Sequence, residues 1–328
     1  MRRKSQTTES TLSAAIRQLS VILKPEGSLL ETHVQLKQNW AIAFNGILAA
    51  GEPIAEDLIA CPNAYDLKNA LAKAGANFSI TQLQDRLSIK ADKFKALIPC
   101  VPVEDIQSAS PDEPIADLSP NFIASIEAVN SVPERNEENV IFRSILLQGG
   151  SIFATDAKVM LEHWHGIDLP KLVLPKSVID PLIKNGKNLS KFGFSKSSCT
   201  FHYEDGSWLR TQYFAEDWPD IRPILDRKAN AHNLPEGLYE ALDALDPFSE
   251  TGFVYFDSNV IRSHPIGQDA GASYEVYGVP KGPILSIDQL KALRPYIKTI
   301  DFLVPNGAHT MTLFFGDKCR GAISGRTG

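Results

Sequence analysis

The sequence lacks the short patterns by which many enzymes are recognised. It contains no Gly-x-Ser-x-Gly, no phosphate-binding Gly-x-x-x-x-Gly-Lys-Ser/Thr loop and no Gly-x-Gly-x-x-Gly. Its four cysteines form no Cys-x-x-Cys pair, which favours reduced thiols in a cytoplasm over a disulfide framework or a zinc site. They are Cys61, Cys100, Cys199 and Cys319. The sequence therefore gives no positive reason to predict an enzyme.

The chain also lacks a long apolar run and an excess of positive charge. No segment approaches the roughly 20 apolar residues of a membrane span, and no apolar stretch follows the basic start as it would in a secretory signal. With 328 residues, 43% of them hydrophobic, the chain can form two or three globular domains. The net charge of −6 argues against a protein held on nucleic acid mainly by an unopposed basic surface. It leaves open a ring that is acidic outside and mildly basic inside, because encirclement retains DNA without strong contacts. We predict a cytoplasmic protein.

Two groups of polar residues could support chemistry. His163 and His165 share one face of a predicted strand, but zinc needs further ligands and none lies nearby in the sequence. Glu216, Asp217 and Asp220 could do acid–base work or hold magnesium, although a solvated turn is the simpler interpretation. We predict no metal and no cofactor. A small-molecule enzyme that uses the His163/His165 or Glu216/Asp220 region is the alternative hypothesis.

The order of predicted elements repeats three times along the chain. Amphipathic helices centred on Ile16, Ile126 and Leu242 lie 110 and 116 residues apart, and each is followed by strands, a second helix and further strands. A period of this length indicates repeated domains rather than a solenoid. The second helices are centred on Leu67, Ile179 and Leu290.

Polar segments separate the three repeats. Residues 107–120 carry several prolines and acidic side chains, and residues 226–233 read DRKANAHN. We predict an α+β protein with three similar domains, at 1–110, 119–226 and 233–328.

The middle repeat contains three motifs whose order and spacing are informative. A hairpin is predicted over 140–166, with turns at 149–151 and at Asp156-Ala157, and it contains Thr-Asp-Ala-Lys at 155–158. Pro-Lys follows at 175–176 and Trp-Pro-Asp-Ile at 218–221. Together they resemble the middle domain of the bacterial sliding clamp, the β subunit of the replicative DNA polymerase. That family has Thr-Asp-Gly at the hairpin end, Pro-Arg or Pro-Lys at a helix start, and Phe-Pro-Asp-Tyr at a strand end.

The resemblance implies a fold and a function. Each clamp domain has two helices packed on antiparallel sheets, and the subunits form a head-to-tail homodimeric ring. Such a ring encircles duplex DNA without sequence preference and tethers polymerase and clamp loader, which raises processivity by effective concentration and needs no catalysis. Deviations in the third domain and the tail would fit a phage or plasmid version. A monomeric interaction module with a clamp fold is a further alternative.

The resemblance also implies a pocket for short partner peptides that carry Gln, Leu and Phe. Its residues in this sequence would be Thr155, Ala157, Lys158, Val159, Met160, Pro219, Ile224, Ala322 and Ser324. The sequence departs from the family at Ala157, where a glycine is usual, at Pro223, where an arginine is usual, and in the tail 321–325, which lacks Met-Pro-Met-Arg. The alternative interpretation is that Val159, Met160 and Ile224 are core residues.

In a clamp, basic residues on the helices would face the central hole and attract phosphates weakly. The candidates are Arg17, Lys24, Lys68, Lys73, Lys176, Lys184, Lys187, Lys291, Arg294 and Lys298. A solvated helix face is the alternative for each of them, and Glu240, Asp243 and Asp246 make the first helix of the third repeat acidic. Residues 93–97 resemble the edge of the first clamp domain that meets the last domain of the neighbouring subunit. The resemblance therefore implies that Phe94 and Ala96 lie in the dimer interface.

Overall fold

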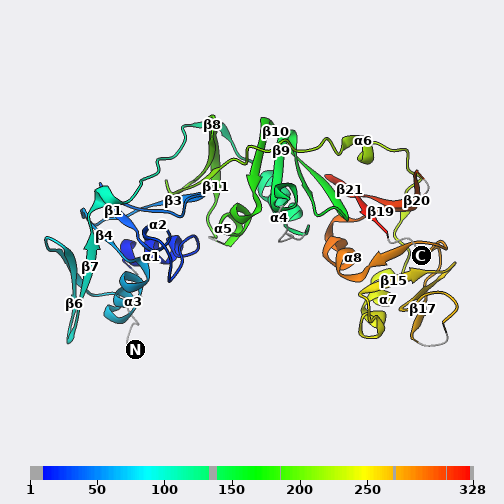
Figure 1. The fold of residues 1–328 in the computed structure, drawn as a ribbon, viewed down its shortest axis with the longest axis horizontal. Helices are drawn as coiled ribbons and strands as arrows, with labels where there is room; N and C mark the ends of the chain where they lie inside the picture. The colour runs from blue at the N-terminus through cyan, green and yellow to red at the C-terminus, as the bar shows by residue number, and fades with distance from the viewer. Residues whose placement is uncertain (1–9, 133–138, 185, 269–270, 308, 326–328) are drawn as a thin grey trace, which may run out of the picture. The chain divides into compact units, whose positions relative to one another are not determined.

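The chain alternates helices with antiparallel sheets, the mixed α+β class that the sequence predicts (Figure 1). The computed structural model describes residues 10–132, 139–184, 186–268, 271–307 and 309–325. Two compact units account for the chain: unit one comprises residues 1–118 and 180–213, and unit two comprises residues 119–179 and 214–328. None of the described helices is long and apolar enough to cross a membrane.

Unit one contains a seven-stranded sheet that joins two distant parts of the sequence. In spatial order its strands are β1 (Gln35–Lys37), β2 (Trp40–Phe44), β3 (Leu48–Pro53), β13 (Trp208–Gln212), β12 (Ser198–Tyr203), β11 (Leu189–Phe194) and β8 (Pro114–Asp117). At the junction Trp208 pairs with Gly51, and a Cβ at Gly51 would lie 2.3 Å from the indole. Only glycine therefore permits this pairing.

A four-stranded sheet and three helices complete the part of unit one before residue 118. The strands, in spatial order, are β4 (Cys61–Pro62), β7 (Phe94–Val101), β6 (Arg86–Ala91) and β5 (Ser79–Gln82), and the helices are α1 (Thr11–Leu19), α2 (Leu29–Thr32) and α3 (Ala64–Ala74). Side chains cap two of these helices, because Ser10 accepts a hydrogen bond from the Ser13 amide and Asn63 accepts bonds from the amides of Tyr65 and Asp66.

Unit two also contains two sheets. The six-stranded sheet runs β14 (His232–Asn233), β19 (Thr299–Asn306), β20 (His309–Phe315), β21 (Cys319–Ser324), β10 (Val159–Pro175) and β9 (Ser144–Thr155). The four-stranded sheet runs β17 (Ser273–Glu275), β16 (Val260–Arg262), β15 (Phe253–Phe256) and β18 (Ile284–Ser286). The helices are α4 (Pro120–Asn130), α6 (Arg222–Leu225), α7 (Leu238–Leu245) and α8 (Ile287–Leu293), while α5 (Ile179–Lys184) starts at the boundary with unit one.

The predicted helices are present at all six positions, because their apolar stripes are buried. The buried stripe of α1, for example, is Leu12, Ala15, Ile16 and Leu19. The predicted turn at 149–151 is wrong: β9 continues through these residues, and the register with β10 shifts between Trp164 and Leu169 instead. The glycines there serve a bulge in a long hairpin, whose turn is the one at Asp156-Ala157.

Two segments that the sequence predicts to be polar linkers contain strands. Residues 114–117 form β8 on the edge of one sheet, and residues 232–233 form β14 on the edge of another. The predicted middle domain, 119–226, contributes residues to both compact units. The three-domain organisation stays a prediction.

Candidate functional site

The turn between β9 and β10 is built from buried polar groups. The Asp156 carboxylate is 1% exposed and accepts hydrogen bonds from the amides of Lys158 (2.9 Å) and Val159 (2.6 Å). The Thr155 hydroxyl donates to the Val159 carbonyl (2.8 Å) and accepts from the Ala157 amide (3.2 Å). Ala157 has a φ of 72°, in the left-handed region that favours glycine. The Thr-Asp pair thus fixes a tight turn at the cost of strain at Ala157.

Three neighbouring elements hold this turn from outside. The Gln289 side chain, on α8, donates to the second oxygen of Asp156 (3.4 Å), and the Ser324 amide, on β21, donates to the Lys158 carbonyl (2.7 Å). The Lys158 ammonium lies 6.0 Å from the centroid of the Phe253 ring, on β15. The turn is therefore positioned by residues from the C-terminal part of unit two.

Met160 and Ile224 contact the same apolar cluster, although they are far apart in the sequence. Met160 lies opposite Thr155 on β9 and opposite Ala322 on β21, so these three side chains share one face of the sheet. The buried members of this apolar cluster are Leu146, Phe153, Val173, Trp218, Ile221, Leu225, Val304, Met311, Leu313 and Ala322. Met160 and Ile224 are only partly buried and form part of its border. Two of the predicted pocket residues, from distant parts of the sequence, therefore border one apolar cluster.

The segment around Trp218 closes the cluster on one side. Trp218 is 3% exposed, and its indole N–H donates to the Ser144 hydroxyl (2.9 Å). Ile221 and Leu225 are buried beside it, whereas Pro219 is exposed. A small cavity of about 90 Å³, lined in part by Trp218 and Pro219, lies beside this segment.

The nine predicted pocket residues differ in exposure. Four are exposed: Ala157, Lys158, Pro219 and Ser324. Two are partly buried, Met160 and Ile224, and three are buried, Thr155, Val159 and Ala322. Val159 is 1% exposed and pairs with Ile323 on the face of the sheet opposite to Met160. The structure therefore places Val159 in the core, as the alternative interpretation expected for it.

The carboxylates near this segment are engaged in surface ion pairs. The Lys171 ammonium contacts Asp217, and the Arg222 guanidinium contacts both oxygens of Asp220 (2.7 and 2.9 Å). These hydrogen bonds lower the pKa of both carboxyl groups. A carboxyl with a lowered pKa is poorly suited to exchange protons near neutral pH. The geometry gives no support to an enzyme centred on Glu216 and Asp220.

The two histidines of the His-Trp-His motif are buried under α4. The Nδ1 atom of His163 lies 2.7 Å from the Ser125 hydroxyl, and the Nδ1 atom of His165 accepts a hydrogen bond from the Ile167 amide (3.1 Å). In the described part of the chain, no group of three His, Cys, Asp or Glu residues could hold a metal ion.

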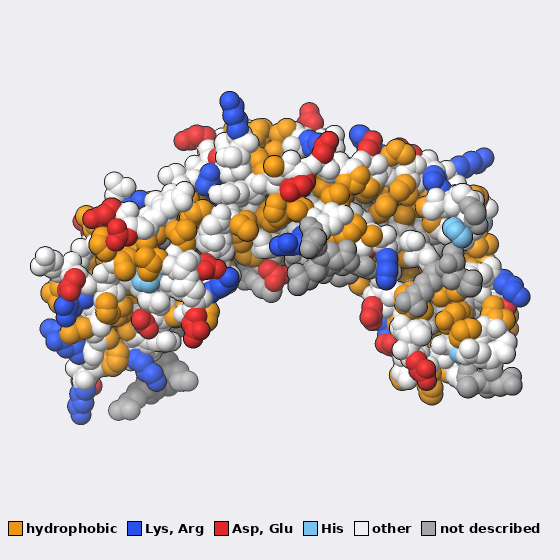
Figure 2. All heavy atoms as spheres, in the orientation of Figure 1, with side chains coloured by type: hydrophobic (Ala, Val, Ile, Leu, Met, Phe, Trp, Pro, Cys, Tyr) orange, Lys and Arg blue, Asp and Glu red, His pale blue; other side chains and the backbone are white. Residues whose placement is uncertain are grey.

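Many of the predicted DNA-facing side chains are paired with neighbouring acids. Lys24 contacts Glu31 (2.5 Å) and lowers the pKa of that carboxyl to about 2. Lys291 contacts Asp243 (2.9 Å) and Asp246 (2.8 Å). Lys298 contacts Asp317, and Lys187 contacts Glu52 and Asp205. On the face drawn in Figure 2, basic and acidic side chains are interspersed rather than gathered into one basic field.

The other predicted DNA-facing residues occupy varied environments. Lys176 is 6% exposed and its ammonium donates to the Val132 carbonyl (3.3 Å), so the prediction that it presents its charge at the surface is wrong. Arg294 packs over the Tyr239 ring (4.8 Å), and Lys73 is exposed on α3. Arg17 and Lys68 line a cavity of about 370 Å³ between α1 and α3. The side chain of Lys184 lies outside the described residues.

The predicted dimer contact lies on a sheet edge. Phe94 and Ala96, both partly buried, pair with β6 on one side. On the other side β4 pairs only with Cys100 and Val101, so in the described part of the chain the first half of β7 has no second partner strand. Leu97, on this half, is 47% exposed.

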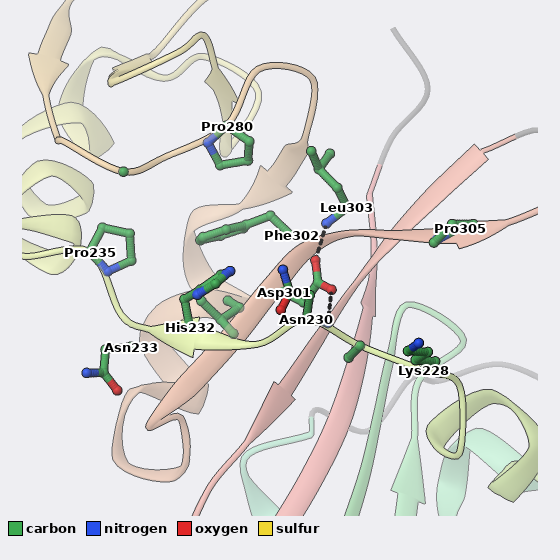
Figure 3. Close-up of a pocket in the computed structure, with 13 residues that line it drawn as sticks. Lys228, Asn230, His232, Asn233, Pro235, Pro280, Asp301, Phe302, Leu303 and Pro305 are labelled. Carbon is green, nitrogen blue, oxygen red and sulfur yellow. Dashed lines mark hydrogen bonds between the residues drawn. The ribbon is translucent and has the colours of Figure 1, made fainter.

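A larger cavity, of about 720 Å³, lies in unit two beside the β19 edge (Figure 3). Its labelled lining residues are Lys228, Asn230, His232, Asn233, Pro235, Pro280, Asp301, Phe302, Leu303 and Pro305. The Asp301 carboxylate accepts hydrogen bonds from the amides of Asn230 (2.7 Å) and Leu303 (3.0 Å), and Arg227 donates to the Pro305 carbonyl (2.7 Å). Because Pro305 has no N–H, this edge is protected against addition of another strand. None of the nine predicted pocket residues lines this cavity.

No family model and no curated protein matches the sequence. Solved structures match it over nearly the whole chain. The Helicobacter pylori β clamp in complex with diflunisal is 16% identical, with a TM-score of 0.79 and coverage of 97% of this chain and 98% of that one. The Pseudomonas aeruginosa DnaN sliding clamp (DNA polymerase III subunit beta) bound to griselimycin is 11% identical, with a TM-score of 0.76 and 97% coverage of both chains. This chain has the sliding-clamp fold. The β subunit from DNA polymerase of Streptococcus pyogenes, with a TM-score of 0.75 and 15% identity over 97% of this chain and 99% of that one, agrees.

One ionic network beside the cluster was not anticipated from the sequence. The Arg320 guanidinium contacts Glu162 (2.7 Å) and Asp226 (2.6 Å), and it lies 5.8 Å from the Trp164 ring. These residues come from β10, β21 and the segment after α6, which the sliding-clamp fold brings together. No local pattern in the sequence links them, so only the fold reveals the network.

Proposed function

We propose that the chain is a DNA polymerase processivity factor: a sliding clamp that closes into a homodimeric ring around duplex DNA and tethers polymerase and other replication or repair proteins. The observation that carries the proposal is the likeness to β clamps over 97% of the chain, with TM-scores of 0.75 to 0.79. The three motifs at 155–158, 175–176 and 218–221 support it independently. The ring acts without catalysis and without a cofactor, and its three domains are those at 1–110, 119–226 and 233–328.

The partner site of this clamp is the border of the apolar cluster that Met160 and Ile224 contact. Met160 and Ile224 offer apolar surface, with Ala157, Lys158, Pro219 and Ser324 exposed around them, and Thr155 and Ala322 buried beneath them. A solved H. pylori β clamp is bound to a DNA ligase peptide, which supports a peptide as the occupant. The peptide would carry Gln, Leu and Phe, and burial of one such apolar side chain contributes about 1.5–3 kcal/mol.

The DNA side of the ring uses basic residues of α1 and α3, chiefly the exposed Lys73 and Arg17 and the partly buried Lys68. Lysines that are already paired with acids, such as Lys291 and Lys298, contribute less, because a paired ammonium releases fewer counterions on meeting a phosphate. Contact with DNA is weak and independent of sequence, and retention comes from the closed ring. Ring closure uses the free half of β7, with Phe94 and Ala96 in the interface.

One experiment tests this function: native mass is combined with retention on circular and linear duplex DNA after loading. We expect a dimer that stays on a nicked circle and is lost when the circle is cut. The variant Phe94→Asp should be monomeric and should be lost from both forms. A wild-type protein that is monomeric, or one that binds linear and circular DNA equally tightly, would overturn the proposal.

A further inference from the structure

Two histidines occupy core positions on β10. Side chains alternate along this strand, so that Leu161, His163 and His165 lie on one face and Glu162 and Trp164 on the other. The first face is covered by α4, which lies against β9 and β10 (Figure 1). His163 is 7% exposed and His165 is 3% exposed. Both imidazoles therefore stand where the alternation of the strand would place aliphatic side chains.

Hydrogen bonds assign a tautomer to each imidazole, and the bond to His165 requires its neutral form. The Ser125 hydroxyl donates to the Asn121 carbonyl (2.8 Å), which leaves its oxygen to accept from the Nδ1–H of His163 (2.7 Å). The Nδ1 atom of His165 accepts from the Ile167 amide, which requires its proton on Nε2. That Nε2 is buried without a hydrogen-bond partner among the described residues, and the Phe122 ring of α4 lies 5.2 Å from the imidazole centroid.

A second proton on either ring would be unfavourable. Burial has the largest effect and lowers the pKa of both histidines, although backbone hydrogen bonds at Trp164 and Ser151 act in the opposite direction. Lys318 further lowers the pKa of His163, and His163 lowers that of His165. The Lys318 ammonium lies at the start of α4, where it contacts the Asn121 side chain (2.6 Å). Charges of the same sign thus face the pair and oppose its protonation.

Among the described residues, the acids of the surrounding elements are exposed or paired with another cation. Asp317, which helps to raise the pKa of Cys319, is paired with Lys298. Cys319, opposite His163 on β21, is itself buried, with the pKa of its thiol raised to about 11. Glu162 lies on the other face of β10 and is paired with Arg320. The carboxylate of α4, Glu127, is exposed, and α4 carries neither Lys nor Arg.

We propose that His163 and His165 form an acid-sensitive latch that holds α4 on the sheet of unit two. While both imidazoles are neutral, they pack under α4 and are linked to it through Ser125. Protonation would require either a buried charge or detachment of α4, and detachment exposes the ring nitrogens to water. The latch is independent of DNA binding, because it concerns the free chain and a helix without basic residues.

The sign of the effect follows from the lowered pKa values. Above about pH 6.5, the ordinary pKa of histidine, both forms of the protein hold neutral imidazoles and the latch is intact. As pH falls below that value, the open form binds protons that the closed form does not. The equilibrium for opening should therefore rise by up to about tenfold per pH unit for each histidine.

Two measurements on the full chain test the latch. The first is hydrogen exchange of the wild type at pH 7.5 and 5.5, corrected for intrinsic rates. We expect faster exchange at pH 5.5 in α4 and in residues 159–167, and little change in α8, which lies in the same unit. Unchanged protection of α4, or a uniform rise across unit two, would overturn the proposal.

The second measurement compares urea unfolding of the wild type and the variant His163→Gln/His165→Leu between pH 7.5 and 5.5. Between pH 6.5 and 5.5 the unfolding constant of the wild type should rise by up to about thirtyfold more than that of the variant, because each of the two histidines contributes up to about 5.5-fold over this interval. His33, whose pKa is also lowered by burial, and the carboxylates act equally in both proteins. The matched control, His232→Gln at an exposed position, should keep the wild-type dependence. An equal pH dependence of the unfolding constant in the wild type and the double variant would refute the latch. If the double variant does not fold, the hydrogen-exchange measurement on the wild type tests the latch alone.

Discussion

Charged side chains occur both in the turn between β9 and β10 and on the basic faces of the helices, but they differ in their exposure to water. Asp156 is 1% exposed, and its partners include two amides of its own turn and the Gln289 side chain. Lys291 is 30% exposed and lies between two aspartates on the surface. A buried charged group without partners costs several kcal/mol, whereas an exposed ion pair contributes about 0–1 kcal/mol. Substitutions in the turn should therefore change folding and partner binding, and substitutions on the helices should change DNA binding alone.

The largest expected effect is that of Asp156→Ala. The change removes a buried acceptor and leaves two amides of the turn unpaired, so the free energy of unfolding should fall by about 3 kcal/mol. Urea unfolding followed by circular dichroism measures it. The control Asp220→Ala removes an exposed carboxylate that is paired with Arg222 and should lower the free energy of unfolding much less. Equal losses in the two variants would show that the turn depends on its backbone alone.

Next in size is Met160→Asp, which places a charge at the border of the apolar cluster. Affinity for a peptide carrying Gln, Leu and Phe should fall at least tenfold, equivalent to about 1.4 kcal/mol, while the fold and the dimer mass are kept. Isothermal titration calorimetry with the peptide measures the affinity. The matched control Met160→Leu preserves volume and apolarity and should bind within about threefold of the wild type.

Either of two results would remove Met160 from the partner site. Unfolding of Met160→Asp would make Met160 a core residue, like Val159. Unchanged peptide affinity in a folded variant would place the partner site elsewhere.

A smaller effect of opposite sign is expected for Ala157→Gly. Ala157 holds a left-handed φ of 72°, which costs an L-residue roughly 1–2 kcal/mol, and glycine adopts it freely. The greater freedom of glycine in the unfolded chain offsets part of this gain, so stability should rise by about 0.5–1 kcal/mol. Thermal unfolding measures it, with Ala215→Gly, at an exposed position outside helices and strands, as the control. A loss of stability at 157 would mean that packing of the methyl group outweighs the strain.

Local sequence predicts this fold wherever a periodic stripe or a capping residue decides the structure. The stripe of Leu12, Ile16 and Leu19 predicts α1, and Thr155 with Asp156 predicts the turn, because both depend on neighbours within a few residues. The glycines at 149 and 150 do not form the turn that the sequence predicts, because a bulge and a turn use the same residue types and only the pairing with β10 distinguishes them. Local sequence does not predict the burial of Lys176 for a related reason: its ammonium bonds the Val132 carbonyl, which comes from a distant part of the chain.

The smallest effect concerns the basic helix faces and compares two lysines of different environment. Lys73 is exposed on α3 and makes no ion pair with another described residue, whereas Lys291 is held by Asp243 and Asp246. If both face DNA, Lys73→Ala should weaken binding to linear duplexes of any sequence and reduce the slope of log affinity against log salt by about 1. Lys291→Ala should change the slope by less, because the wild-type ammonium is already neutralised by its acidic neighbours. Fluorescence anisotropy on two unrelated duplexes at several salt concentrations measures both slopes. A larger change in the salt slope for Lys291→Ala than for Lys73→Ala would mean that DNA displaces the aspartates from Lys291. The exposure of a lysine in the free chain would then not predict which helix face meets the phosphates.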